Sequence, residues 1–82
     1  MRTEPGRRSQ ADEPLAVARR AAERYAEAVG DTQRFADRLD GVPDPADVAE
    51  YAALVAREEA ARAQRQEAFL SLGFTIDSVE EA

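Results

Sequence analysis

The sequence of 82 residues contains no cysteine, no histidine and no lysine, so all 11 of its basic residues are arginine. Without cysteine the chain forms no disulfide and no zinc–thiolate site. Without histidine it lacks the commonest general base and metal ligand, and without lysine it cannot form a Schiff base. We therefore expect a protein that is not an enzyme and that uses no metal or cofactor.

Large apolar side chains are also scarce. Tryptophan is absent, and leucine, isoleucine, valine and phenylalanine together supply 15 residues. That share lies near the level of about 20% below which a highly charged chain tends towards disorder. Abundant alanine, arginine and glutamate favour helix instead. Because a single core of this size rarely contributes more than about 3–5 kcal/mol, we expect helices that complete their core by association with another protein or a second copy.

No apolar run approaches the roughly 20 residues of a membrane-spanning helix. The formal net charge is −6, and the excess of acid lies towards the carboxyl end, whereas residues 1–10 form a short basic arm. An acidic protein is poorly suited to the phosphate backbone of nucleic acids. The start of the chain lacks the apolar segment of a secretory signal. We expect a cytoplasmic protein that binds neither membranes nor nucleic acid.

The segment Asp40–Asp47 divides two stretches rich in alanine, arginine and glutamate. Gly41 is a typical helix stop, and Asp44 followed by Pro45 is a typical N-cap and first helical residue. The sequence therefore predicts an all-α fold, an antiparallel two-helix hairpin. Its expected parts are a disordered arm over residues 1–10, a hairpin domain over 11–73 with helices at about 12–40 and 45–72, and an acidic tail over 74–82.

The first helix carries apolar residues at a seven-residue spacing, as in coiled coils. A break at Gly30–Asp31 is possible because glycine costs about 1 kcal/mol inside a helix, but the repeat continues through it and favours one helix. The repeat has two seams and a flanking row: Leu15, Ala22, Val29 and Ala36; Ala18, Tyr25, Thr32 and Leu39; and Ala21, Ala28 and Phe35.

The second helix is expected to end at Leu72, where Gly73 would take a left-handed cap conformation and Phe74 would fold back on Phe69. A helix over residues 45–72 has one apolar stripe. Its members are Val48, Tyr51, Leu54, Val55, Ala61, Ala68, Phe69 and Leu72.

Charged side chains interrupt that stripe. Glu58, Arg62 and Arg65 project to the same side as Val55 and Phe69. One interpretation is a polar layer in a helix–helix interface, which would select the partner because an unmatched buried charge is costly. The other is an exposed Glu58–Arg62 pair, worth a few tenths of a kcal/mol.

The expected tail holds three apolar residues, Phe74, Ile76 and Val79, before two glutamates. They form either a short docking motif for a partner protein or a cap contact followed by frayed residues. Acidic side chains near residues 44–50 do not indicate a metal site, because helix capping already accounts for Asp44 and Asp47.

These observations favour a small non-catalytic interaction module that presents helical surface to a protein partner or pairs with itself, most simply as a dimer forming a four-helix bundle. A regulatory role such as sequestering a transcription or sigma factor fits its size. The alternatives are a self-assembling structural subunit and a non-catalytic accessory subunit of an enzyme. The expected partner-binding residues are Tyr25, Tyr51, Leu54, Val55, Glu58, Arg62, Phe69, Phe74 and Ile76.

Overall fold

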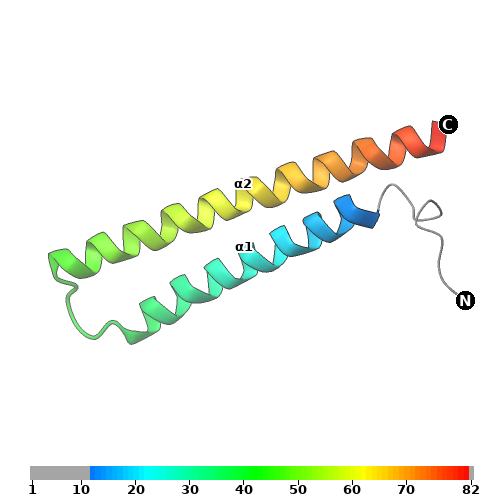
Figure 1. Cartoon of the computed structure of the whole chain (residues 1–82). Helices are drawn as coiled ribbons and strands as arrows, with labels where there is room; N and C mark the ends of the chain where they lie inside the picture. Colours follow the sequence, from blue (N-terminus) through cyan, green and yellow to red (C-terminus); the bar gives the residue numbers. More distant parts are fainter. Residues whose placement is uncertain (1–11, 82) are drawn as a thin grey trace, which may run out of the picture.

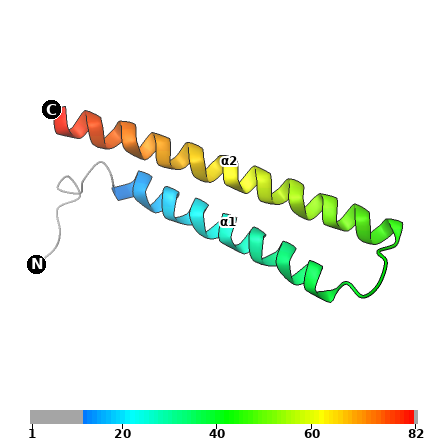
Figure 2. The ribbon, with the colours of Figure 1, turned by 180° about the vertical axis from the view of Figure 1, so that it is seen from behind.

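The computed structural model describes the backbone of residues 12–81 and the side chains of residues 12–74. Two helices, α1 (Asp12–Arg38) and α2 (Pro45–Glu81), run antiparallel and pack along the length of α1 (Figures 1 and 2). At 1.5 Å per residue, α1 alone is about 40 Å long. The all-α hairpin predicted from the sequence is confirmed, and the expected arm at residues 1–10 lies outside the described residues.

Helix α1 is continuous through Gly30 and Asp31. The Thr32 hydroxyl, which could have capped a new helix at this point, donates a hydrogen bond to the Ala28 carbonyl one turn earlier, at 3.1 Å. The buried hydroxyl is therefore satisfied within the same helix. Asp12 and Glu13 lie in the first turn and Arg38 in the last, where their charges complement the helix dipole.

The connection between the helices follows the local rules of the sequence. Gly41 adopts a φ of 82°, the left-handed region that glycine reaches without steric cost. Asp44 then caps α2, because its Oδ1 accepts a hydrogen bond from the Asp47 amide at 2.8 Å. The Asp44 amide in turn donates to Asp47 Oδ2 at 3.2 Å. This reciprocal pair fixes the start of α2 at Pro45.

The predicted end of the second helix is wrong. Helix α2 continues beyond Leu72 to Glu81, and among the described residues only Gly41 has a positive φ. Gly73 is therefore an interior helical residue, and Phe74, with 72% of its surface exposed, does not fold back as a cap. Extending an existing helix needs no new nucleus, so the cost of about 1 kcal/mol for one glycine does not stop it. The backbone from Phe74 to Glu81 is helix rather than a separate tail.

The buried interior consists mainly of small side chains. Helix α1 turns towards α2 the seam from Ala18 to Leu39 and the row from Ala21 to Phe35. The other seam, which contains Val29, lies at the edge of the contact, and Val29 is 38% exposed. Two large apolar residues, Phe35 and Leu72, are buried among the described side chains. The other buried residues are Ala18, Ala21, Ala28, Thr32 and Ala61.

Substitution of Gly73 by alanine tests the corrected end of α2. No atom lies within 4 Å of the position of an added Cβ, so Gly73→Ala should stabilise the helix by up to about 1 kcal/mol. Gly41→Ala is the matched control and should destabilise, because its φ of 82° is unfavourable for alanine. Thermal unfolding followed by circular dichroism measures both. A Gly73→Ala variant destabilised as strongly as Gly41→Ala would contradict a helix that passes through residue 73.

Candidate interaction surface

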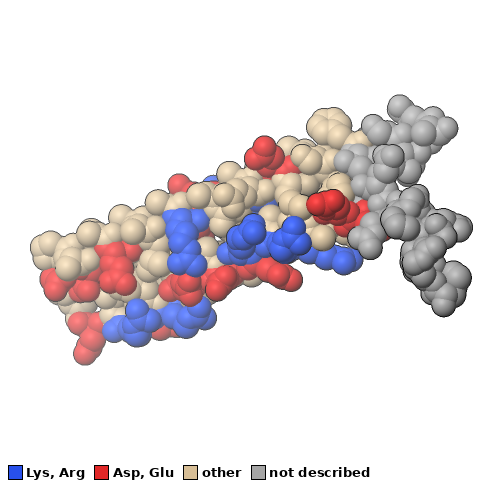
Figure 3. Space-filling model, in the orientation of Figure 1, with Lys and Arg blue, Asp and Glu red and all other residues tan. Residues whose placement is uncertain are grey.

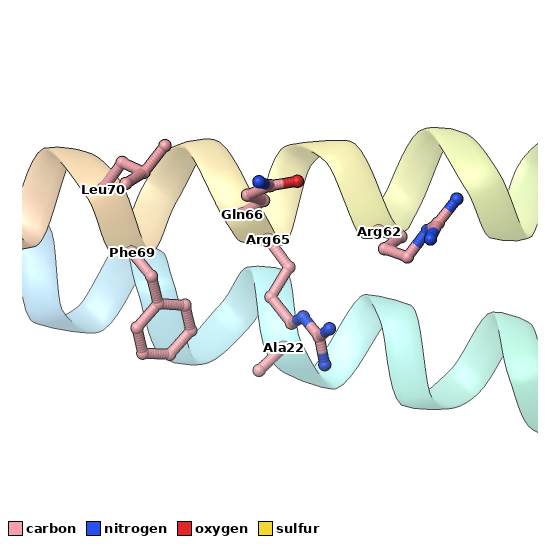
Figure 4. A pocket seen from close by; sticks show the side chains of 6 residues that line it. All are labelled: Ala22, Arg62, Arg65, Gln66, Phe69 and Leu70. Atoms are coloured by element: carbon pink, nitrogen blue, oxygen red, sulfur yellow. The ribbon is translucent and has the colours of Figure 1, made fainter.

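Side-by-side packing of α1 and α2 leaves an open groove on each side of their contact. The first, here called the Phe69 groove, encloses about 560 Å³ at its wider end (Figure 4). It continues towards the loop past Tyr25 and Val55, the two parts meeting at Arg62. Its lining residues are Ala22, Tyr25, Val55, Glu58, Glu59, Arg62, Arg65, Gln66, Phe69 and Leu70.

The apolar part of the Phe69 groove comes from Ala22 on α1 and from Val55, Phe69 and Leu70 on α2. Ala22 belongs to the seam of α1 that runs from Leu15 to Ala36, and Val55 and Phe69 belong to a row of α2 that also contains Val48 and Arg62. Seven residues are close to two turns, so each row stays on one face of its helix. Phe69 is 46% and Val48 58% exposed. The hairpin therefore uses one apolar face of each helix and leaves a second face open.

Tyr25 and Arg65 interact across the Phe69 groove. The Arg65 guanidinium carbon lies 4.3 Å from the centre of the Tyr25 ring, within the range of a cation–π contact. Figure 4 shows Arg65 and Phe69 reaching from α2 towards α1, where Ala22 lies. Both members of the Tyr25–Arg65 pair are half-buried. The pair is thus part of the packing between the helices and forms one wall of the groove.

The structure divides the predicted partner-binding residues between the contact of the two helices, the Phe69 groove and positions outside both. Tyr51 stacks on Phe35 with ring centres 6.4 Å apart, and Leu54 is half-buried, so both belong with Tyr25 to the contact between α1 and α2. Val55, Glu58, Arg62 and Phe69 line the Phe69 groove.

Two predicted anchors lie elsewhere. Phe74 is exposed and does not line the Phe69 groove, and the side chain of Ile76 lies outside the described residues. Leu70 and Gln66 line the groove without having been predicted, because the apolar stripe read from the sequence passes beside them.

The charged residues of α2 are not paired as an isolated helix would pair them. Among the described residues, ion pairs occur only at Asp31, and Glu58 and Arg62 do not bond to each other. Glu58 is half-buried and Arg62 is exposed at the rim of the groove. The interpretation as a Glu58–Arg62 pair is therefore wrong for this hairpin, and both side chains keep their bonding capacity for other groups.

The opposite groove, here called the Arg57 groove, is charged. Arg57 donates to Asp31 Oδ2 at 2.7 Å, and Arg34 pairs with the other oxygen of the same carboxylate. Arg24 and Glu27 line the groove nearby. In Figure 3 acidic and basic side chains lie close together over α1 and the middle of the molecule. The Asp31–Arg57 pair joins residues 26 apart, so only the register of the two helices reveals it.

Within residues 12–74 no group of acidic side chains is arranged to hold a metal ion. No helix of the described part is both long enough and apolar enough to cross a membrane. No protein family, curated protein or solved structure matches the chain. The Phe69 groove is therefore the feature on which a functional interpretation depends.

The pKa of Asp31 offers a direct check of the hairpin register. The hydrogen bond from Arg57, and then that from Arg34, lowers the pKa of this carboxyl below its ordinary value of 3.8. A carboxyl whose pKa is lowered by folding stabilises the fold above its unfolded-state pKa, and that stabilisation is lost as the pH falls through the folded-state pKa. We expect Arg57→Gln to raise the pKa of Asp31 and to reduce the loss of stability below about pH 4.

Carbon-detected NMR titration of the Asp31 carboxyl measures this shift. Arg24→Gln is the control, because Arg24 lies in the same groove without bonding to Asp31. An equal pKa change in the two variants would mean that the Asp31–Arg57 contact does not form in solution.

Proposed function

We propose that this protein is a small, non-catalytic helical interaction module whose Phe69 groove binds another helical surface. The supporting observation is the distribution of apolar side chains. Most of the buried residues are alanines, whereas Val29, Val48, Phe69 and Leu70 remain 38–59% exposed. A hairpin that leaves its larger apolar side chains outside its own core is suited to association.

The energetic argument supports the same surface. Burial of apolar area contributes about 25 cal/mol per Å², so covering the exposed parts of Phe69 and Leu70 would add of the order of 1–2 kcal/mol for each residue. This gain is a large fraction of what a core of this size provides. Aromatic and large aliphatic side chains in a desolvated centre dominate the binding energy of interfaces. Phe69 and Val55 are therefore the proposed anchors.

The form of the groove favours a helix as the bound element. Each wall contains a row of side chains that repeats every two helical turns. A partner helix with a similar apolar row can place that row between the two walls. Arg62, Arg65, Glu58 and Glu59 line it with both signs of charge. Because charges that are buried without partners are costly, these residues would discriminate between partners.

Two roles fit this surface, and for both we propose a cytoplasmic location. As a regulatory module it would capture a helix of a different protein. As a structural subunit it would pack against further copies of itself, and the seven-residue repeat of α1 favours this second role because such repeats are typical of helical bundles.

Site-specific photo-crosslinking tests the proposed surface for either kind of partner. A photoreactive phenylalanine analogue in place of Phe69, in cells that produce the protein at its natural level, should give a discrete crosslinked product. The same analogue in place of Phe74 is the control, because Phe74 is also an exposed phenylalanine of α2 but lies outside the groove. Adding Val55→Asp should abolish the product at position 69, since a carboxylate would then stand in the apolar wall.

Equal crosslinking at positions 69 and 74, or a product at 69 that survives Val55→Asp, would show that the Phe69 groove is not the binding surface. The mass of the product separates the two roles, since a second copy adds 9.0 kDa.

A further inference from the structure

The charges along the Phe69 groove point to a specific occupant. We infer that a second copy of the chain packs on this groove with α2 antiparallel to α2 of the first copy, so that the two interhelical loops lie at opposite ends of a four-helix bundle. This inference rests on the proposed function, because it requires the Phe69 groove to be the binding surface. It adds the identity and the orientation of the partner.

The first step is the division of charge between the helices. Helix α2 brings an acidic block, Glu58 and Glu59, next to a basic block, Arg62 and Arg65. Glu58, Glu59 and Arg62 form no ion pair among the described residues. On α1 the groove is lined by Ala22 and Tyr25, and the seven-residue row through Ala22, which also contains Leu15, Val29 and Ala36, carries no charge.

The second step is the symmetry that matches these charges. The two blocks are centred about five residues apart, on either side of residue 61, which is about 7–8 Å along the helix. A two-fold axis perpendicular to α2 near residue 61 brings the acidic block of each copy opposite the basic block of the other. Two equivalent sets of contacts result, while the uncharged rows of α1 meet each other.

The alternative symmetry leaves the charges unmatched. With both loops at the same end, α2 of each copy would lie against α1 of the other. The Glu58–Glu59 and Arg62–Arg65 blocks would then face alanine and valine. Desolvation of charges without partners is unfavourable. The distribution of charge therefore selects the arrangement with loops at opposite ends.

The available area is consistent with a stable pair. Helix α1 is about 40 Å long and two helices side by side are about 20 Å wide, so the face offers roughly 800 Å² per copy. Specific complexes bury about 800 Å² per partner. The same contact would cover Val29, Val55 and Phe69, which the hairpin leaves partly exposed.

Charge reversal at two exposed positions tests the pairing. Glu59→Arg and Arg62→Glu, each alone, place like charges opposite each other twice in the dimer and should weaken self-association by roughly tenfold or more. An equimolar mixture of the two variants should recover most of the loss as a heterodimer, since both of its charge contacts join opposite charges again. The double variant Glu59→Arg/Arg62→Glu should recover both contacts.

Sedimentation equilibrium across a concentration series measures these dissociation constants, with circular dichroism to confirm that each variant is helical. Glu67→Arg is the control, since it makes the same change of charge at an exposed position of α2 beside the opposite groove. Single variants no weaker than Glu67→Arg, or a double variant as weak as the single ones, would overturn the inferred arrangement.

The orientation has its own measurement. The chain contains no cysteine, so Val42→Cys in the loop, where the side chain is 93% exposed, accepts a single spin label per copy. Loops at opposite ends should give a distance of about 50 Å between labels, from 1.5 Å of rise per residue on each side of residue 61. A distance below about 25 Å would place the loops at one end and overturn the inference.

Failure of this inference and failure of the proposed function give different results. A wild-type chain that is monomeric at every concentration, yet crosslinks from position 69 to a different protein, would overturn the second copy as occupant and keep the Phe69 groove as the binding surface. Absence of selective crosslinking at position 69 would overturn both.

Discussion

The contact between α1 and α2 through alanine is the constraint on which the remaining structure depends. Ala18, Ala21 and Ala28 of α1 meet a face of α2 that contains Ala61. Small side chains let two helices approach closely, but each buries little apolar area and contributes correspondingly little to stability. The core of the hairpin therefore contributes little to its stability. Larger apolar side chains outside the core can contribute as much stability as those within it once another molecule covers them.

The two grooves show how the same packing produces unlike surfaces. On one side the contact is closed by the Asp31–Arg57 pair, with Arg34 on the same carboxylate. On the other, no ion pair joins the helices, and apolar side chains lie beside Glu58, Glu59 and Arg62, which form no ion pair within residues 12–74. Among the described residues, an ion pair therefore ties the helices together on the first side only. The second side has the larger hollow and exposes Phe69 and Leu70, which is the physical basis for assigning the association to the Phe69 groove.

The sequence predicted the local features well and failed where local rules compete. Gly41, Asp44 and Asp47 have the roles that their residue types indicate, because a turn glycine and a capping carboxylate act over a few residues. Gly73 has the same residue type as Gly41 but lies inside α2. A glycine ends a helix only when leaving the helix is more favourable than the modest cost of continuing, and residue type alone does not decide that balance.

The sequence by itself determined the helical class, the position of the turn and the existence of two apolar seams on α1. It could not determine which seam closes, because Ala18, Tyr25 and Thr32 lie only about 50° around the helix from Ala22 and Val29. The tertiary structure decided this by the rotation and register of the two helices, which bring Phe35 onto Tyr51 and Asp31 onto Arg57. Such contacts join residues 16 and 26 positions apart, so they depend on the whole hairpin rather than on any local pattern.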